Sequence, residues 1–226
     1  MQKMTEISLI GVGGIGSNLA ISLASAISFS PLVSSLGGIR LNILDSDIVE
    51  ERNLLIGQRF SHSDIGKKKV HAVKDSISEF EGSLLKVHPI VKDVRRISDI
   101  PDSDIAVVCV DNMSAREVVH GLDIPWLDLR CSGDGYIAID HRVEGSVISS
   151  LSKGGNGPQS CQLEGWESGF IQAGFLAAAT HGFQWIIAAL RLLQDNNNSI
   201  LPLPRSSSVT FGMLGELPIS EVFCHG

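Results

Sequence analysis

The sequence has no Cys-X-X-Cys pair, and its four cysteines stand far apart along the chain. A disulfide framework needs cysteines in a compact pattern, so this distribution argues against one and fits a reducing compartment. The sequence also lacks a signal-peptide pattern, because Met1-Gln2-Lys3 leads directly into a strand-like run. We therefore expect a cytoplasmic protein.

Basic residues are in the minority. The chain has 18 lysines and arginines and 25 acidic residues, which gives a net charge of -7. Such a surface repels nucleic acid and anionic membranes, so we expect neither as a partner; the cluster Lys67–Lys69 is a local exception. The apolar stretch 170–193 is long enough to span a membrane, but polar residues such as Gln172 and Arg191 interrupt it. We expect it to form a buried helix of a soluble fold.

Apolar residues make up 43% of the chain and lie in short runs that alternate with helical patterns. The predicted strands are 6–12, 39–44, 86–94, 104–112 and 124–131, and the predicted helices are 14–28, 63–80 and one capped by Asn112 or Ser114. This alternation predicts an α/β fold with a Rossmann-like, doubly wound, mainly parallel sheet. We expect a single domain over residues 1–226.

The C-terminal part has a different character. We expect an antiparallel hairpin over 135–151 and a last hairpin over 206–220, which together extend the parallel sheet with antiparallel strands. A glycine-rich loop, 152–169, and the long helix 170–193 lie between the hairpins. Nearer the start of the chain, residues 30–38 are predicted to be an irregular link.

A glycine-rich turn follows the first predicted strand, with glycines at positions 11, 13, 14 and 16. Glycines at this spacing let the backbone approach a phosphate, which then lies at the N-terminus of the following helix. The next strand ends in Asp45 and Asp47, carboxylates suited to a ribose; a helix cap or a turn is the alternative interpretation, which the preceding strand disfavours. A nicotinamide dinucleotide and an ATP cleaved at its α-phosphate both fit this opening.

The segment after the acidic pair favours ATP. It carries Asn53, Gln58, Arg59 and Lys69. Negative charge builds on the phosphate oxygens during phosphoryl transfer, and fixed donors and cations stabilise it, whereas a dinucleotide site has no need of them there. Asp111 ends the fourth strand, at the same edge of the sheet, and could hold Mg²⁺.

The order of these motifs resembles the superfamily of ThiF, MoeB and the ubiquitin-activating enzymes. The matching residues are Gly11, Gly13 and Gly16, then Asp45-Ser46-Asp47, Asn53-Leu54, Gln58, Gly66 to Lys69, and Cys109 to Asn112 with Arg116. The match covers residues 7–120, and the loop and long helix that follow resemble the crossover loop and helix of that family. The closing segment is similar to short bacterial ThiF-like proteins found beside ubiquitin-like proteins in conjugation and antiphage operons.

The resemblance implies ATP-dependent adenylation of the C-terminal carboxylate of a ubiquitin-like protein. It implies that Asp47 binds the ribose, that Lys69 and its polar neighbours contact the phosphates, and that Asp111 binds Mg²⁺. The implied nucleotide ligands are Gly11, Gly13, Gly14, Gly16, Asp45, Asp47, Asn53, Gln58, Lys69 and Asn112. It also implies a homodimer or heterodimer, and a conjugating enzyme as a further partner. Residues 1–120 would bind the nucleotide, and residues 121–226 the protein partner.

Three departures from the family pattern bear on this interpretation. Gly57 stands where the family has an arginine, so Arg59 or Arg52 is the candidate substitute. The upstream arginine of the family is also missing, and a partner subunit could supply it. Many relatives hold zinc with two Cys-X-X-Cys pairs, so we predict no structural zinc here.

Cys161, in the glycine-rich loop, is the candidate acceptor that would form a thioester from the acyl adenylate. Cys131 is the second choice, while Cys109 is expected in the core and Cys224 in an inert tail. The pair His181 and Gln184 is interpreted as buried and structural. Two alternatives remain: a non-catalytic scaffold subunit of a heterodimer, which the missing arginine favours, and an NAD-dependent oxidoreductase.

Overall fold

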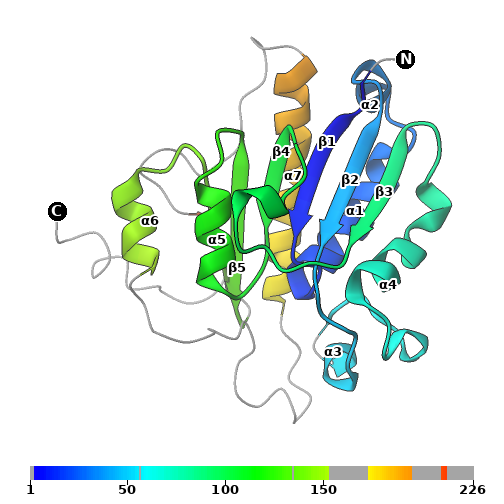
Figure 1. Cartoon of the computed structure of the whole chain (residues 1–226), viewed down its shortest axis with the longest axis horizontal. Helices are drawn as coiled ribbons and strands as arrows, with labels where there is room; N and C mark the ends of the chain where they lie inside the picture. Colours follow the sequence, from blue (N-terminus) through cyan, green and yellow to red (C-terminus); the bar gives the residue numbers. More distant parts are fainter. Residues whose placement is uncertain (1–2, 56, 134, 153–172, 195–209, 213–226) are drawn as a thin grey trace.

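The computed structural model describes residues 3–55, 57–133, 135–152, 173–194 and 210–212 (Figure 1). Its strands are β1 Thr5–Ile10, β2 Ile39–Leu44, β3 Leu85–Ile90, β4 Ile105–Val108, β5 Trp126–Ser132, β6 Gly135–Asp140 and β7 Thr210–Gly212. They form one sheet in the order β3-β2-β1-β4-β5-β6-β7. Strands β1 to β5 pair in parallel, and β6 and β7 are antiparallel. The predicted fold class, a parallel sheet extended by antiparallel C-terminal strands, is confirmed.

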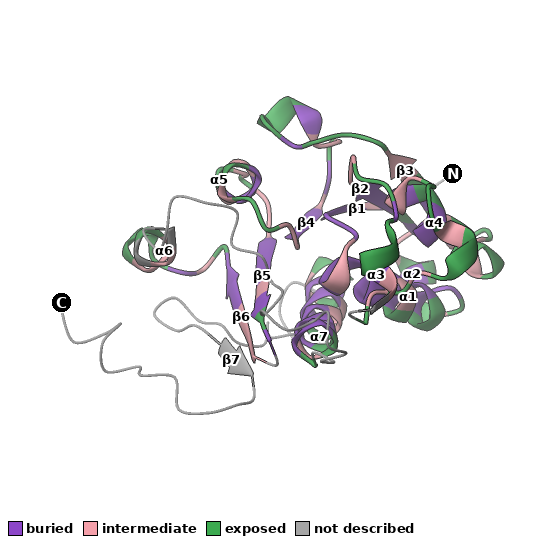
Figure 2. Cartoon of the chain, turned by 90° about the horizontal axis from the view of Figure 1, so that it is seen from below, coloured by how far each residue is buried: buried purple, intermediate pink, exposed green. Residues whose placement is uncertain are grey.

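Helices cover the sheet on both sides (Figure 2). They are α1 Gly14–Ile27, α2 Pro31–Ser35, α3 Glu51–Leu55, α4 Lys69–Ser76, α5 Met113–His120, α6 Gly145–Ser152 and α7 Gly174–Gln194. Buried side chains of α1, α4 and α7 share one hydrophobic core with the sheet, and α5 and α6 pack into a second core on the opposite face. The two cores enclose β4, whose four residues are all buried, as a β-branched run predicts for a central parallel strand.

Local signals set several element ends. Asn112, rather than Ser114, is the N-cap of α5, and its Oδ1 accepts a hydrogen bond from the Ala115 backbone N at 2.8 Å. The predicted helix over 63–80 is shorter, with α4 flanked by 3₁₀ turns at His62–Asp64 and Ser78–Phe80. The link 30–38 is not wholly irregular, because Pro31 opens the short helix α2, where its missing N–H is no loss.

The expected hairpin over 135–151 is wrong in its second half. Residues 135–140 form β6, but Gly145–Ser152 is the helix α6. A short apolar run fits strand and helix equally well, and packing decides between them: Val147, Ile148 and Leu151 lie against the core beneath α5. β6 instead pairs with β5. Of the last predicted hairpin, 210–212 forms β7, and the remainder lies outside the described residues.

α7 is the one helix in the described ranges that is long and apolar enough to cross a membrane by length and composition. It packs along α1 and against β5 and β6, and its Trp185 and Leu190 are fully buried. His181 is buried as predicted, with its Nδ1 at 3.4 Å from the Tyr136 hydroxyl, but Gln184 is exposed. Two positions one turn from each other need not face the same way, because three residues turn the helix by only about 300°.

Candidate functional site

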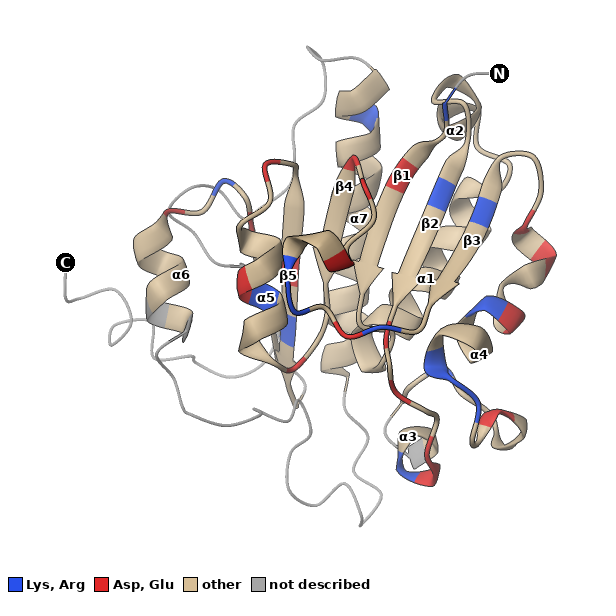
Figure 3. Cartoon of the chain, viewed as in Figure 1, with Lys and Arg blue, Asp and Glu red and all other residues tan. Residues whose placement is uncertain are grey.

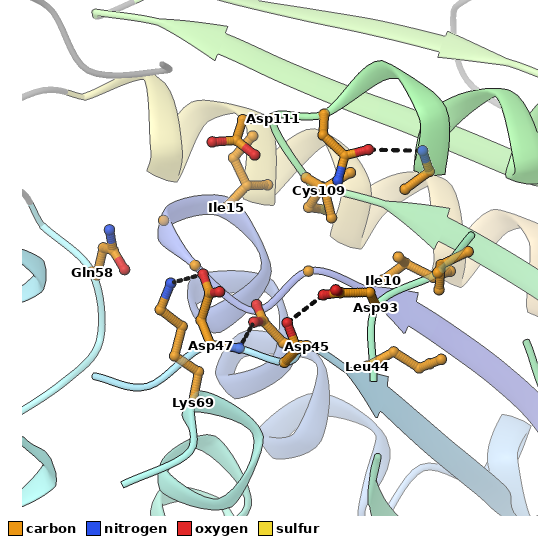
Figure 4. Close-up of a pocket in the computed structure, with 18 of the residues that line it drawn as sticks. Ile10, Ile15, Leu44, Asp45, Asp47, Gln58, Lys69, Asp93, Cys109 and Asp111 are labelled. Carbon is orange, nitrogen blue, oxygen red and sulfur yellow. Dashed lines mark hydrogen bonds and ion pairs between the residues drawn. The ribbon is translucent and has the colours of Figure 1, made fainter. Parts of the chain in front are cut away.

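A cavity of about 410 Å³ lies at the carboxyl ends of β1, β2 and β4. In this sheet β1 stands between β2 and β4, so the chain crosses away from β1 in opposite directions, and ligands bind at such a switch point. Figure 4 shows residues from all three strand ends facing the cavity. The predicted site residues that line it are Gly11, Gly13, Gly14, Asp45, Asp47, Asn53, Gln58, Lys69, Asp111 and Asn112.

The glycines of the turn after β1 have different roles. Gly11 has a φ of +88°, and a Cβ there would lie 2.7 Å from Val110 Cγ1. A Cβ on Gly16 would lie 1.9 Å from the Gly11 carbonyl oxygen, so Gly16 is needed for close packing of α1 on the turn and does not line the cavity. A Cβ on Gly13 would meet nothing closer than Gln58 Oε1 at 3.9 Å. Gly13 therefore leaves space where a ligand can approach the backbone.

Asp45 holds the glycine turn in place. Its two carboxylate oxygens accept hydrogen bonds from the backbone N of Val12 at 2.9 Å and of Asp47 at 2.8 Å. Burial raises the pKa of Asp45, and the nearby Lys69 ammonium opposes that rise. With both oxygens engaged, Asp45 fixes the relative position of the β1 and β2 ends and forms the floor of the cavity.

Asp47 and Lys69 face each other at the opening of the cavity. Lys69 Nζ lies 2.8 Å from Asp47 Oδ2, and the Lys69 backbone N donates to the Asp47 carbonyl at 3.0 Å. Figure 3 shows basic residues at the start of α4 and acidic residues following β2. The Lys69 side chain is 11% exposed and that of Asp47 is 64% exposed, so the lysine is held within the site while the carboxylate remains accessible.

Two amide side chains complete the wall of the cavity near the turn. Asn53 is buried, and its Oδ1 accepts a hydrogen bond from the Glu50 backbone N at 2.7 Å. Gln58 Oε1 is buried and has no hydrogen-bond partner among the described residues. An unpaired buried polar atom is costly, and a side-chain amide can turn its NH₂ toward an acceptor. Gln58 is thus suited to a ligand at the glycine turn.

The structure brings Arg52, not Arg59, to the cavity. Arg52 lines it and forms an ion pair with Glu50 at 2.6 Å. Arg59 points to α1, where its Nε donates to Asn18 Oδ1 at 2.7 Å. The sequence offered both as substitutes for the missing family arginine, and of the two only Arg52 lines the cavity.

Asp111 lies in the short loop between β4 and α5. Its side chain is exposed at the cavity and has no hydrogen bond or ion pair with any described residue. Within the described ranges, no three His, Cys, Asp or Glu side chains lie close enough to hold a metal by themselves. Mg²⁺ binds through one or two carboxylates together with phosphate oxygens, so this single free carboxylate fits it.

The cavity includes residues that the sequence did not single out. Lys92, Asp93 and Val94 enter it from the segment after β3, and Phe175 enters it from α7. A Cβ on Gly14 would lie 2.5 Å from the Phe175 ring, so the start of α7 closes directly on the turn. The predicted strand 86–94 included Lys92 and Asp93, but β3 ends at Ile90, so both residues follow the strand and reach the cavity. No local pattern indicates Phe175.

Two of the four cysteines can be placed. Cys109 is half-buried: it packs against the hydrophobic core, as expected, but it follows the end of β4 at Val108 and also lines the cavity. Cys131, the second choice for a reactive thiol, is buried in β5 and does not line the cavity. Cys161 and Cys224 lie outside the described residues.

A sequence model of the ThiF family matches residues 2–212. The chain belongs to the ThiF family. A maize relative, "Adenylyltransferase and sulfurtransferase MOCS3-1", is 29% identical over 119 residues, which are 52% of this chain and 23% of that protein.

Solved structures share the ThiF-family fold. E. coli MccB crystallised with AMPCPP and MccA superposes with a TM-score of 0.61 at 16% identity, over 95% of this chain and 65% of MccB. MccB with ATP gives 0.59 at 18% identity, over 96% and 66%, and PaaA gives 0.57 at 19% identity, over 88% and 59%. The chain thus spans about two thirds of MccB and less than a quarter of MOCS3-1.

Proposed function

We propose that the chain binds ATP in this cavity and transfers its adenylyl group to a carboxylate. The observation that carries the proposal is the convergence of the glycine turn, Lys69 and Asp111 on one cavity of about 410 Å³. Membership of the ThiF family supports it, as do MccB structures that contain ATP or AMPCPP.

The residues divide the work along the nucleotide. The backbone N–H groups of the glycine turn and the N-terminus of α1 receive the phosphates, and the accessible Asp47 carboxylate receives the ribose. Lys69, Arg52 and Gln58 surround the α-phosphate and stabilise the charge that develops on its oxygens. Asp111 would hold Mg²⁺, which would supply positive charge to neutralise the phosphates.

The reaction is an in-line displacement at the α-phosphorus. A carboxylate oxygen of the substrate forms a bond to this phosphorus, and the bond to the oxygen that bridges the α- and β-phosphates breaks. That oxygen keeps the electron pair and leaves with pyrophosphate. The product is an acyl adenylate, and no oxidant or reductant is needed.

We further propose that the carboxylate is the C-terminus of a ubiquitin-like protein. The MccB structures that contain MccA beside a bound nucleotide analogue or alone support a second partner at this fold. Cys161 would then attack the acyl adenylate, release AMP and hold the partner as a thioester. Along the chain Cys161 lies between α6 and α7, and α7 reaches the cavity through Phe175, which supports this role.

Exchange of pyrophosphate with ATP tests the reaction. The chain is mixed with ATP, Mg²⁺ and a candidate ubiquitin-like protein, chosen from genes adjacent to its own, and exchange is expected that depends on this partner. Asp111→Asn should reduce exchange strongly. ATP binding without exchange, for every neighbouring partner tested, would instead support the scaffold subunit, which the absence of Arg59 from the cavity favours.

The thioester has its own test. A dithiothreitol-sensitive adduct of the chain and the partner is expected with wild type and not with Cys161→Ala. Cys109→Ser, at the cavity wall, and Cys131→Ser are the matched controls. Persistence of the adduct in Cys161→Ala would contradict the assignment. Exchange without any adduct would mean that the adenylate passes directly to the next acceptor.

A further inference from the structure

A buried charge network lies behind the loop that carries Asp111. Its centre is Asp128, on β5, which is fully buried. The Asp128 carboxylate accepts hydrogen bonds from Arg116, on α5, and from Arg130 Nη2 at 2.7 Å, and it lies 3.0 Å from His120 Nε2. Arg116 and His120 are one turn apart on α5, so both reach across to the same strand.

Arg116 joins this network to the loop. Besides Asp128, its guanidinium donates to the carbonyl of Val110, the residue directly before Asp111. On the other side of Asp111, Asn112 is fixed as the cap of α5. The backbone on both sides of Asp111 is therefore tied down, while the Asp111 side chain itself remains free of described partners.

His120 takes part as a neutral donor. Burial lowers its pKa to about 4, and the Arg130 and Arg116 guanidiniums add to this effect. Its ring stacks on Trp126 with the centroids 4.5 Å apart, and its Nδ1 is buried without a hydrogen-bond partner among the described residues. A neutral ring adds a hydrogen bond to the Asp128 carboxylate without a third positive charge beside the two arginines.

None of these network residues lines the cavity. Asp128, Arg116 and His120 therefore do not contact the cavity directly, and the bond from Arg116 to the Val110 carbonyl joins them to the loop. Outer residues that orient a metal-binding carboxylate commonly change metal affinity by about 10-fold or more when they are altered. Three donors on one buried carboxylate, joined to the Val110 carbonyl, form such an outer support.

We propose that Asp128 and Arg116 are positioning residues for Asp111: the buried Asp128 carboxylate holds the Arg116 guanidinium, which holds the Val110 carbonyl and so aims Asp111 into the cavity. The role of Asp111 in this inference rests on the proposed function. The placement of the loop does not, and the two are measured separately.

Amide hydrogen exchange of the full chain without nucleotide tests the placement. Arg116→Lys keeps the charge but lacks the planar fork that bonds Val110 and Asp128 together, so faster exchange is expected over residues 109–113 and not over β1. Asp128→Glu is a second variant, in which one additional methylene moves the carboxylate further from the β5 backbone. Unchanged exchange over 109–113 in both variants, with the fold intact, would overturn the proposal whatever the chemistry of the chain.

ATP affinity, measured with Mg²⁺ and with EDTA, tests the consequence. Mg²⁺ is expected to increase the ATP affinity of wild type, and this increase should be about 10-fold smaller in Arg116→Lys. The ATP affinity in EDTA should be the same for both proteins. Adding Asp111→Asn to Arg116→Lys should cause no further loss beyond that of Asp111→Asn alone, because both changes act through one carboxylate. Equal losses with Mg²⁺ and with EDTA, or additive losses, would contradict positioning.

Arg142→Lys is the matched control. Arg142 pairs with another fully buried carboxylate, Asp140, with Nη2 2.5 Å from Oδ2, on β6 and away from the loop. It should affect stability without changing the Mg²⁺-dependent gain. If Mg²⁺ does not increase the ATP affinity of wild type, the proposed role of Asp111 is wrong. The hydrogen-exchange experiment then tests by itself whether Arg116 and Asp128 hold the loop over residues 109–113.

Discussion

Lys69 Nζ lies 2.8 Å from Asp47 Oδ2 at the opening of the cavity, so two residues expected to bind different parts of a nucleotide neutralise each other. The ion pair is partly exposed, and such pairs contribute no more than about 1 kcal/mol. A triphosphate carries several negative charges and can displace Asp47 from Lys69 at small cost. The pair thus keeps Lys69 extended toward the cavity and leaves Asp47 free for a ribose once ATP is bound.

Replacing this lysine should affect the phosphates and not the nucleoside. For Lys69→Met we expect ATP affinity to fall about 10-fold or more, because a charge-assisted hydrogen bond is lost, with little change in adenosine affinity. Titration calorimetry with ATP and with adenosine measures both. Lys67→Met is the control, since Lys67 pairs with Asp64 at 3.0 Å and does not line the cavity. Equal losses for adenosine and ATP would contradict this role of Lys69.

Substitution of Arg52 and of Arg59 should have different effects on catalysis and on stability. Arg52→Ala removes a cation that lines the cavity, and we expect slower ATP–pyrophosphate exchange with a smaller effect on ATP affinity. Arg59→Ala breaks its contact with Asn18 and should change the free energy of unfolding more than it changes exchange. Exchange rates and urea unfolding on both variants decide the matter. The opposite pattern would assign the role of the family arginine to Arg59.

Two glycines of the turn should respond differently to alanine. In Gly16→Ala the new Cβ would overlap the Gly11 carbonyl, so we expect a loss of about 3 kcal/mol or more in the free energy of unfolding. In Gly13→Ala the nearest atom is 3.9 Å away, so the fold should be affected less while ATP binds more weakly. Urea unfolding and ATP titration measure the two effects. A Gly13→Ala protein with wild-type ATP affinity would show that phosphates do not approach this position.

His120 should make stability depend on pH. Its pKa is lowered to about 4 in the folded chain, mainly by burial, from 6.5. Between these values the unfolded chain binds more protons than the folded one, so the free energy of unfolding falls as the pH is lowered from 7 toward 4. His120→Gln should weaken this fall, and His62→Gln, in an exposed turn, should not. Urea unfolding at pH 7 and pH 5 measures this change in the free energy of unfolding. An equal decrease in wild type and in His120→Gln would show that His120 is not the group responsible.

Sequence motifs predicted much of the site because they are local. The glycine turn, the acidic end of β2, Lys69 at the start of α4 and Asp111 after β4 all line the cavity. Each lies within a few residues of a strand end, and parallel strands bring their carboxyl ends to one edge of the sheet. Lys92 and Asp93 also follow a strand, but the predicted strand 86–94 was too long and included them, so the sequence did not indicate them.

The sequence could not predict contacts between distant segments. Arg59 is adjacent to Gln58 and Arg52 lies six residues before it, yet Arg52 reaches the cavity and Arg59 contacts α1, because the path of the segment decides where each side chain lies. The run 145–152 fits strand or helix locally, and the core beneath α5 made it a helix. Phe175 reaches the turn because α7 packs along α1.

By itself the sequence determined the parallel strands with the helices α1, α4 and α5, the glycine-rich turn and most of the polar residues at the strand ends, because these depend on neighbouring residues and on a periodic pattern. Tertiary structure alone decided that Asp45 supports the turn, that Lys69 pairs with Asp47, and that Asp128 holds Arg116 behind Asp111. Those pairings join residues from separate elements, and which buried donor meets which acceptor is fixed only when the sheet and its helices pack together.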